Sequence, residues 1–405
     1  MKKKSNLITV HKNKSFKKNV IVPTSKSYAN RLLILGALSK NVITIKNLPQ
    51  STDVISLINC FKVIGIKYDY DEVKNDIVIH NSFPLCEQVQ NNSINLDTKD
   101  GGTTNRFLIA MLSLGKNNYI VHPTERMINR PMDDLFNPLR LMNVSIIKNS
   151  NSWEIKGPLK PLDQLTVDCS KSTQFASALR MILPQCKFNL MNLNASALYY
   201  KITETLLNDC SKGKQFFTVP LDFSSLGYPV ALGLTLGETN IENYTEVDKL
   251  QADGQLIEIT KKMKGSIIDS SSGLQCKQSH LSAIDIKCDL FPDLVPTLIF
   301  LCSYARGKSR LYNISILKHK ESDRLAEMIN LLLLFKVKHN YNKETDCLEI
   351  FGYKETLEEK VICKTAKDHR IIMVATLFLL KNSGGEVYFP ESVKKSYPTF
   401  FEDFL

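Results

Sequence analysis

Short polar segments alternate with apolar stretches of helical length along this chain. In the first half, residues 24–27 precede the apolar run 31–38, residues 101–104 precede 106–112, and residues 170–174 precede 175–181. A cap-forming or glycine segment followed by apolar residues predicts a buried helix whose first turn carries polar groups. The layout recurs at intervals of roughly 70 residues, which predicts a repeated structural unit.

The second half repeats this layout with different polar residues. Here the polar segments and the runs they open are 224–225 with 227–232, 289–293 with 294–305, 318–321 with 322–335, and 368–370 with 371–380. Short β-branched pieces predict strands at 43–45, 77–79, 119–121, 284–286 and 348–350. With 405 residues, the chain suits two α/β domains of about 200 residues, each built from repeated strand–helix units.

The charge of the chain favours small anionic partners. Its formal net charge is +11, and seven of its lysines lie in the first 18 residues. The remaining positive charge is dispersed, whereas nucleic-acid binding favours a dense basic stripe with aromatic residues, so we expect no nucleic-acid partner. The runs 294–305 and 371–380 are shorter than the roughly 20 residues that span a bilayer. With no apolar signal-peptide core near the N-terminus, we expect a cytoplasmic protein without a membrane partner.

Ten cysteines occur singly, without a Cys-x-x-Cys pair or a Cys/His cluster at metal-ligand spacing. This pattern is typical of reduced, mostly buried thiols. We therefore expect neither a metal nor a cofactor.

The polar segments before the helices offer a way to bind anions. The first turn of a helix has unpaired backbone N–H groups and a partial positive charge. Gly or Ser there lets an anion approach the backbone, and Lys or Arg adds a charged donor. Each segment alone is more typical of an ordinary N-cap or turn. Seven such segments in one chain favour an anion-binding cleft.

A set of short motifs covers nearly the whole chain. They are 23–31, 101–106, 125–127 with Arg130-Pro131, 172–174, Ser196 with Tyr199, Pro292-Asp293, 320–324, 368–370, and Lys395 before Pro398. Each motif is short, but in this order they are specific. The chain resembles the 5-enolpyruvylshikimate-3-phosphate synthase family, a family of enolpyruvyl transferases.

The resemblance implies a fold of two similar α/β domains, each from three βαβαββ units in an inside-out, barrel-like arrangement, closing on substrate at the cleft between them. It also implies that the first residues return to the C-terminal domain. We place an N-terminal lobe, mainly for shikimate 3-phosphate, at residues 21–218. The C-terminal lobe, with phosphoenolpyruvate binding and the catalytic carboxylates, comprises residues 1–20 and 219–405. We expect a monomer.

The implied activity is transfer of the enolpyruvyl group of phosphoenolpyruvate to the 5-hydroxyl of shikimate 3-phosphate, in the shikimate pathway to chorismate and aromatic amino acids. Shikimate 3-phosphate would contact Lys26, Ser27, Arg31, Ser172, Thr173, Gln174, Tyr199, Asp293 and Lys320. Phosphoenolpyruvate would contact Lys26, Gly102, Arg106, Arg126, Gln174, Arg324, Arg370 and Lys395. A cluster of cations suits two substrates that bring several negative charges together.

The chemistry requires the 5-hydroxyl to lose a proton and the methylene carbon of phosphoenolpyruvate to gain one. We expect Asp293 to act as the general base, and Glu321 or Lys26 as the proton donor. Cationic side chains would stabilise the charge that develops around a tetrahedral intermediate. Other interpretations are an N-cap for Asp293, a solvated face with local ion pairs for residues 321–324, and a core histidine for His369.

Several positions depart from the family pattern. Asp100 stands where many members carry Asn, so it could pair with a cation or weaken anion binding. Ala197-Leu198 replaces Lys-Pro, Phe107 replaces Pro, and Ile316 stands where Asn often occurs. Gly102 leaves room beside the proposed phosphoenolpyruvate site, so we expect glyphosate to compete there.

Three alternatives stay open at this point. A UDP-sugar enolpyruvyl transferase would carry Lys-Asn near its first helix and a reactive Cys on a mobile loop, whereas here Ser27 follows Lys26 and no Cys lies between 86 and 169. A drifted paralogue would bind anions without this reaction. A nucleic-acid-binding protein would be retained on DNA in a salt-dependent manner and would release no phosphate.

Overall fold

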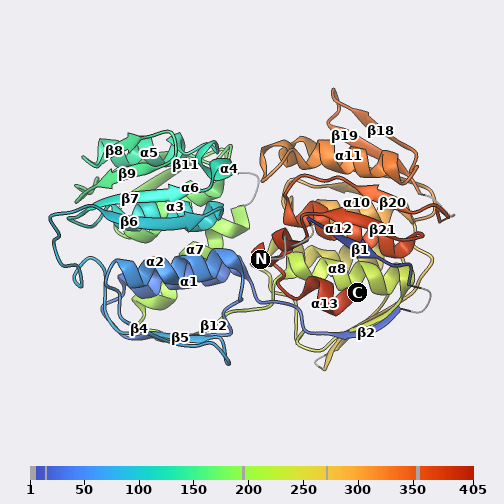
Figure 1. Ribbon diagram of the computed structural model, residues 1–405, viewed down its shortest axis with the longest axis horizontal. Helices are drawn as coiled ribbons and strands as arrows, with labels where there is room; N and C mark the ends of the chain where they lie inside the picture. Colours follow the sequence, from blue (N-terminus) through green and yellow to red (C-terminus); the bar gives the residue numbers. More distant parts are fainter. Residues whose placement is uncertain (1–5, 14–15, 194–196, 271, 353–355) are drawn as a thin grey trace. The chain divides into compact units, whose positions relative to one another are not determined.

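The chain forms two compact units (Figure 1), and the computed structural model describes residues 6–13, 16–193, 197–270, 272–352 and 356–405. One unit comprises Thr24–Pro220, and the other comprises Met1–Pro23 with Leu221–Leu405. The chain therefore passes between the units near Pro23 and again near Pro220. The substrate roles that the sequence assigns to the two lobes stay predictions.

The unit of residues 24–220 contains two sheets of the same topology. Its strands are β3 (Ile43–Lys46), β4 (Tyr68–Asp71), β5 (Asp76–Ile79), β6 (Ile94–Lys99), β7 (Asn118–Pro123), β8 (Ser145–Lys148), β9 (Trp153–Lys156), β10 (Gln164–Asp168), β11 (Lys187–Met191) and β12 (Phe216–Thr218). In the sheets β12-β3-β5-β4 and β6-β7-β9-β8, a parallel pair is followed by an antiparallel hairpin. The third sheet is the parallel pair β10-β11.

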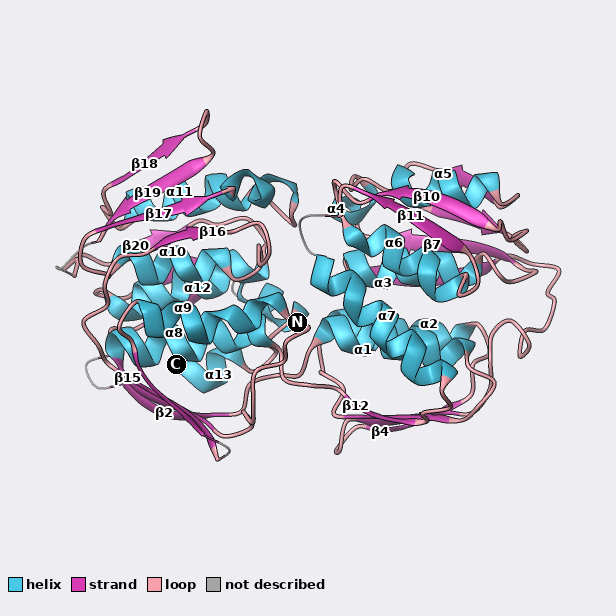
Figure 2. Ribbon diagram, turned by 180° about the vertical axis from the view of Figure 1, so that it is seen from behind, coloured by secondary structure: helices cyan, strands magenta, loops and turns pink. Residues whose placement is uncertain are grey.

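Helices fill the interior of this unit. They are α1 (Lys26–Leu38), α2 (Thr52–Val63), α3 (Gly102–Leu112), α4 (Glu125–Ile128), α5 (Asp133–Leu141), α6 (Thr173–Ile182) and α7 (Ala197–Ser211). The helix α3 packs against α1, α2 and α6, while the β12-β3-β5-β4 sheet lies outside α1 and α2 (Figure 2). All eleven residues of α3 are buried. A helix buried on every side must be apolar, or its polar groups must be bonded, and the side-chain amide of Asn105 donates 2.8 Å to the carbonyl of Gly101.

The second unit repeats the four-stranded topology. Its strands are β1 (Leu7–Val10), β2 (Phe16–Val20), β13 (Gly237–Ile241), β14 (Ser266–Ser270), β15 (Gly273–Lys277), β16 (Asp285–Lys287), β17 (Lys308–Tyr312), β18 (His339–Asn342), β19 (Cys347–Phe351), β20 (Val361–Cys363) and β21 (Gly385–Tyr388). The sheets β14-β15-β13-β2 and β16-β17-β19-β18 each combine a parallel pair with an antiparallel hairpin. In the third sheet β21 lies between β1 and β20.

The N-terminal strands belong to this second unit by direct pairing. The strand β2 runs parallel to β13, and β1 runs antiparallel to β21. Only glycine fits at position 237 beside β2, because an added methyl group would lie 2.1 Å from the carbonyl oxygen of Phe16. Strand pairing of this kind links residues more than 200 positions apart, which no local pattern predicts.

Apolar helices form the centre of the second unit. Its helices are α8 (Phe223–Leu236), α9 (Leu256–Lys262), α10 (Val295–Ser303), α11 (Arg324–Leu334), α12 (His369–Lys381) and α13 (Phe400–Phe404), with 3-10 helices η1 (Ala252–Gln255), η2 (Ile314–His319) and η3 (Pro390–Lys395). The helices α8, α10 and α12 pack against one another, and all nine residues of α10 are buried. Helices that are apolar all round are those expected inside a domain. Within the described residues, no helix combines the length and hydropathy needed to cross a bilayer.

Most of the predicted elements are confirmed. Four of the five β-branched pieces lie within β3, β5, β7 and β19, and the fifth overlaps β16 from Asp285 on. Of the two long apolar runs, 294–305 contains α10 and 371–380 lies within α12. The predicted helix at 322–335 is wrong at its start: α11 begins at Arg324, because the Asp323 side chain accepts from the N–H of Ala326 at 3.0 Å and caps it there. All cysteines except Cys86 and Cys210 are buried.

Candidate active site

Lys26 is the first residue of α1, and its ammonium group is paired with a buried carboxylate. Its Nζ lies 2.9 Å from Oδ2 of Asp53 in the first turn of α2. Only 3% of the Asp53 side chain and 16% of the Lys26 side chain is exposed. This pair was not predicted, because an acid in the first turn of a helix looks like an ordinary response to the helix dipole.

The glycine pair at the start of α3 brings the backbone close to charged groups. A methyl group added at Gly101 would lie 2.9 Å from the carboxyl carbon of Asp53, and one at Gly102 would lie 2.5 Å from Nη1 of Arg130. The start of α3 therefore lies against an acid and a cation at once. The three atoms nearest to that added methyl at Gly102 all belong to Arg130, and the contact of Arg126 with phosphoenolpyruvate stays a prediction. The signal for Arg130 was present in the Arg130-Pro131 motif.

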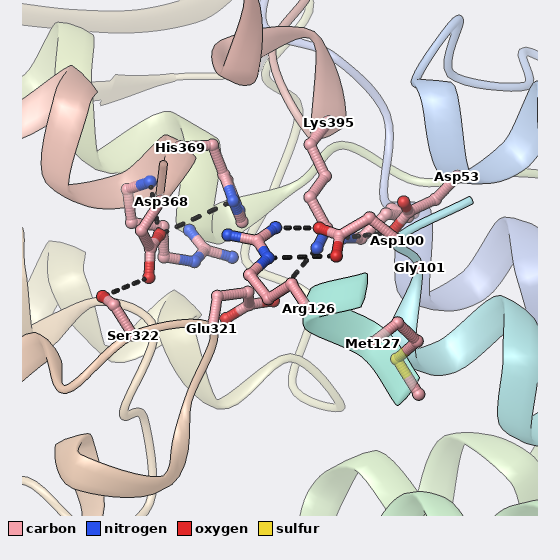
Figure 3. A network of polar contacts seen from close by, with 12 residues as sticks. Asp53, Asp100, Gly101, Arg126, Met127, Glu321, Ser322, Asp368, His369 and Lys395 are labelled. Carbon is pink, nitrogen blue, oxygen red and sulfur yellow. Dashed lines mark hydrogen bonds and ion pairs between the residues drawn. The ribbon is translucent and has the colours of Figure 1, made fainter. Parts of the chain in front are cut away.

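Arg126 is paired with Asp100 (Figure 3). Nε of Arg126 donates to Oδ1 of Asp100 at 3.0 Å, and Nη2 donates to Oδ2. The hydroxyl of Thr124 donates to the same carboxylate at 2.9 Å. Of the two outcomes that the sequence left open for Asp100, pairing with a cation is therefore the one observed.

Arg106 and Gln174 meet between α3 and α6. Nη1 of Arg106 donates to Oε1 of Gln174 at 2.6 Å, and its guanidinium stacks on Phe175 with 4.6 Å to the ring centroid. Gln174 lies in the first turn of α6, where the Ser172 side chain accepts from the Gln174 N–H at 3.2 Å. The helix start predicted to bind phosphate thus begins with a serine cap and the buried Thr173. Ser196 lies outside the described residues.

Arg31 is buried on the inner side of α1, with 1% of the residue exposed. Its Nε donates to the Thr203 hydroxyl at 2.8 Å, and its Nη groups donate to the carbonyls of Ser27 at 2.8 Å and Tyr199 at 2.9 Å. The guanidinium also lies over the ring of Phe107 at 5.2 Å. Burial lowers the pKa of the Arg31 guanidinium to about 10.

In the second unit, three carboxylates surround the guanidinium of Arg324. Nη1 donates to Asp293 at 2.7 Å, Nη2 to Glu321 at 2.5 Å, and Nε to Asp368 at 2.8 Å. Burial by itself would lower the pKa of Arg324, but these three acids outweigh it and raise the pKa above its ordinary value. The alternative of a solvated face at 321–324 is wrong for Arg324 and Glu321, which are 1% and 14% exposed.

Asp293 bridges two arginines and is not a helix cap. Its second oxygen accepts from Nη2 of Arg370 at 3.0 Å, and the N-cap of α10 is Leu294. Burial would raise the pKa of Asp293, but the charges of Arg370 and Arg324 outweigh it and hold the pKa well below its usual range. Lys320 lowers that pKa further. The carboxylate is therefore ionised at neutral pH, as a general base must be.

Glu321 and Asp368 each contact further residues besides Arg324. Nζ of Lys395 lies 3.7 Å from Oε1 of Glu321. Asp368 caps α12 by accepting from the N–H of Arg370, and it accepts from the Ser322 hydroxyl at 3.1 Å (Figure 3). His369 is buried, with Nδ1 at 3.7 Å from Asp368, as the core-histidine interpretation requires. Five predicted residues, Asp293, Glu321, Arg324, Arg370 and Lys395, thus form one network.

A further buried acid, Asp253 of η1, was not predicted. Its carboxylate accepts from the Ser224 hydroxyl of α8 at 2.5 Å, and 2% of the residue is exposed. Burial raises the pKa of the Asp253 carboxyl to about 6, and the negative charge of Asp293 raises it too. Among the described residues, no group of three or more His, Cys, Asp or Glu side chains is arranged to hold a metal ion.

The fold is that of the enolpyruvyl transferases. It matches a solved EPSP synthase from Acinetobacter baumannii with a TM-score of 0.77 at 21% identity, over 98% of this chain and 96% of that chain. It also matches the enolpyruvyl transferase NikO from Streptomyces tendae with a TM-score of 0.71 at 13% identity, over 98% and 96% of the two chains. At these identities the likeness establishes the class of fold.

The sequence itself identifies the family. The profile of EPSP synthase (3-phosphoshikimate 1-carboxyvinyltransferase) matches residues 10–404. The chain is 30% identical to the 3-phosphoshikimate 1-carboxyvinyltransferase of Buchnera aphidicola subsp. Cinara cedri, over 95% of this chain and 93% of that protein. It is 28% identical to the enzyme of the same name from Pyrococcus abyssi, over 95% and 93% of the two proteins. This chain belongs to the EPSP synthase family of enolpyruvyl transferases. These matches do not favour the UDP-sugar transferase or the drifted paralogue.

Proposed function

We propose that this chain transfers the enolpyruvyl group of phosphoenolpyruvate to the 5-hydroxyl of shikimate 3-phosphate and releases phosphate, in the cytoplasm and without a cofactor. One observation carries the proposal: the family match over residues 10–404 coincides with buried cations, each paired with a carboxylate, at the positions of the family motifs. Two anionic substrates need cations to hold them, and the proton transfers need an acid and a base.

The start of α6 and the side chain of Arg31 support binding of shikimate 3-phosphate. The start of this ten-residue helix, next to Ser172 and Thr173, suits its phosphate, because a helix N-terminus carries a partial positive charge. The described hydrogen bonds of Arg31 go to neutral oxygens, so a substrate carboxylate would give it a charge-assisted partner. The remaining proposed contacts are Lys26, Ser27, Gln174, Tyr199, Asp293 and Lys320.

The start of α3 supports binding of phosphoenolpyruvate. Gly102 is the first residue of α3 and has the guanidinium of Arg130 beside it, and Lys26, Arg106, Arg126 and Gln174 are proposed as further contacts. In the second unit Arg324, Arg370 and Lys395 are proposed to bind the same substrate. Each of these three cations is paired with a carboxylate, and a substrate anion would compete for it.

Asp293 is proposed as the general base that takes the proton of the 5-hydroxyl. Bridging Arg324 and Arg370 makes its carboxylate a weak proton acceptor. When phosphoenolpyruvate engages those arginines, Asp293 loses cationic partners and becomes more basic. Substrate binding would thus activate the base. Glu321 and Lys26 are both proposed as candidates for protonating the methylene carbon.

The test is release of phosphate from purified protein mixed with shikimate 3-phosphate and phosphoenolpyruvate. We expect release that requires both substrates, with Asp293→Ala and Lys26→Ala each losing roughly 10²–10⁴-fold in kcat. Asp285→Ala is the matched control, because this carboxylate in β16 is paired with Arg310 in β17 and is 49% exposed. Folded wild-type protein that releases no phosphate at millimolar substrate would end the proposal.

Rapid-quench analysis of the variants Glu321→Gln and Lys26→Met can show which of the two residues is the proton donor. Loss of the donor blocks formation of the tetrahedral intermediate, while calorimetry reports whether both substrates still bind. The variant that binds both substrates without forming the intermediate identifies the donor. If both variants form the intermediate, neither candidate is the donor.

Gly102→Ala tests the placement of phosphoenolpyruvate at α3. The added methyl would lie 2.5 Å from Nη1 of Arg130, so the guanidinium would have to move away from the helix start. We expect glyphosate inhibition to weaken by about tenfold or more, with a smaller rise in the KM for phosphoenolpyruvate. Unchanged inhibition by glyphosate would contradict the placement.

A further inference from the structure

A buried asparagine ties the end of β6 to the start of α3. Asn105 is the fourth residue of α3, and both Asn105 and Thr98 of β6 are completely buried. The side-chain oxygen of Asn105 accepts from the Thr98 hydroxyl at 2.5 Å, and its side-chain nitrogen donates to the carbonyl of Gly101 at 2.8 Å. The same nitrogen lies 3.5 Å from the carbonyl oxygen of Thr98. One amide group thus spans the turn formed by residues 98–101.

This turn has a backbone conformation that its own residues do not favour. Lys99 has a φ of 53°, in the left-handed region that a non-glycine residue enters only at an energetic cost. The pairing of β6 with β7 is irregular between Asp97 and Lys99. Gly101, the N-cap of α3, makes no side-chain hydrogen bond to the helix. The conformation therefore depends on groups outside the turn, and the Asn105 amide is one of them.

Packing alone does not explain an asparagine at position 105. All eleven residues of α3 are buried, so an apolar side chain would fill the position without the cost of burying an amide. Asparagine is also a weaker helix former than the straight-chain residues. An amide, however, carries an acceptor and two donors, which lets it bond a hydroxyl and a carbonyl at once. What the amide adds is therefore a fixed turn before the helix.

We propose that Asn105 is a positioning residue for the anion site at the start of α3. The inference rests on the proposed function, in which phosphoenolpyruvate binds beside Gly102. The carbonyl of Gly101 and the N–H of Gly102 belong to one planar peptide group. By holding that carbonyl oxygen, the Asn105 amide also sets the direction of the N–H that begins the helix. A donor fixed before binding loses little freedom when the anion arrives, so the fixed turn raises affinity.

Two variants of nearly equal shape test the proposal. Asn105→Val removes the side-chain hydrogen bonds, whereas Asn105→Thr supplies a hydroxyl that can donate to the carbonyl four residues earlier. Thr376 and Thr260 make this bond in their own helices, at 2.9 Å and 2.7 Å. We expect Asn105→Val to raise the KM for phosphoenolpyruvate by roughly tenfold, and Asn105→Thr to stay within about threefold of the wild type. The KM for shikimate 3-phosphate should stay unchanged in both.

Asn382 in the other unit is the matched control. It is 2% exposed, and its side-chain nitrogen donates to the carbonyl of Phe378, also four residues earlier, at 2.7 Å. Asn382 lies at the end of α12 and not at a helix start. Asn382→Val and Asn382→Thr should therefore differ in melting temperature and leave the KM for phosphoenolpyruvate unchanged. If Asn105→Val likewise changes only the melting temperature, Asn105 has a structural role alone and the proposal is overturned.

Two further outcomes would also overturn it. Equal increases in the KM for phosphoenolpyruvate in Asn105→Val and Asn105→Thr would show that the bond to Gly101 is not the cause. Equal increases in the KM of both substrates would indicate a general distortion of the unit. If Asn105→Val does not fold, Thr98→Val takes its place, because it removes only the donor that orients the amide. It should raise the KM for phosphoenolpyruvate by about threefold, and an unchanged KM would contradict the proposal.

Binding measurements separate this role from the proposed function. The dissociation constant of phosphoenolpyruvate, measured by calorimetry with shikimate 3-phosphate present, should increase from the wild type to Asn105→Thr and again to Asn105→Val. A wild type that binds phosphoenolpyruvate but releases no phosphate would overturn the proposed function only. Equal dissociation constants for the three proteins would overturn only the role of Asn105. A wild type that binds no phosphoenolpyruvate would overturn both.

Discussion

Two arginines, one in each compact unit, are almost completely buried, yet their partners are opposite in kind. Arg31 donates to hydroxyl and carbonyl oxygens, which are neutral. Arg324 donates to three carboxylates. Accordingly, burial lowers the pKa of Arg31 to about 10, whereas the carboxylates raise that of Arg324 despite its burial. Two arginines with nearly the same exposure thus lie in opposite electrostatic environments.

The difference shows two ways of preparing a site for an anion. Without carboxylates to compensate it, the charge of Arg31 costs stability on burial, and a ligand carboxylate would remove that cost. Arg324 already has its compensating charges, so a ligand must displace or share carboxylates, one of which is the proposed base. The arrangement around Arg31 favours affinity for the ligand. The arrangement around Arg324 couples ligand binding to the basicity of Asp293, the proposed base.

The largest expected effect comes from Arg324→Met. This change leaves Asp293, Glu321 and Asp368 close together without their shared cation, and breaking buried pairs in this way typically costs about 3–5 kcal/mol. Urea unfolding at pH 7 measures the loss. At pH 5 the loss should be smaller, because the crowded acids can take up protons. Arg324→Lys, which keeps the charge, should recover part of the stability. A loss below 1 kcal/mol would show that the network is not buried as described.

Arg31→Met should separate stability from affinity. Its neutral partners lose hydrogen bonds, but a buried charge disappears as well, so we expect a loss of no more than about 2 kcal/mol. The KM for shikimate 3-phosphate should rise by about 100-fold, because a charge-assisted contact is lost. Unfolding curves and initial rates measured on the same preparation check both. If stability falls as far as in Arg324→Met, the contrast between the two arginines is wrong.

An effect on stability alone, without a change in substrate binding, is expected at Asp253, an acid held by a serine hydroxyl. Its pKa of about 6 lies above the ordinary value of 3.8, so the folded state binds this proton more tightly than the unfolded state does. Stability therefore falls as pH rises from about 4 to 6, and the full penalty is present above pH 6. Asp253→Asn should raise the free energy of unfolding by about 1–3 kcal/mol at pH 8 and leave it unchanged near pH 4. Equal effects at both pH values would contradict the raised pKa.

Much of the fold could be predicted because its signals are local. Apolar runs bounded by polar caps gave the helices α10 and α12, and β-branched pieces gave five strands. The start of α11 was missed because residues 318–321 look like a helix opening, whereas Asp323 provides the cap three residues before Ala326. The motifs also named the five residues of the Arg324 network, since their order along the chain is what identifies the family.

The sequence by itself determined the class of fold and the family, and it named most of the charged residues of the proposed site, because composition, periodicity and the order of motifs can be read along the chain without its folded structure. Only the tertiary structure decided which carboxylate each cation meets. Lys26 and Asp53 are 27 positions apart, and Arg370 and Asp293 are 77 apart. Such pairs form because an opposite charge nearby stabilises a charge inside the protein, and the fold as a whole decides which side chains the packed helices bring within reach.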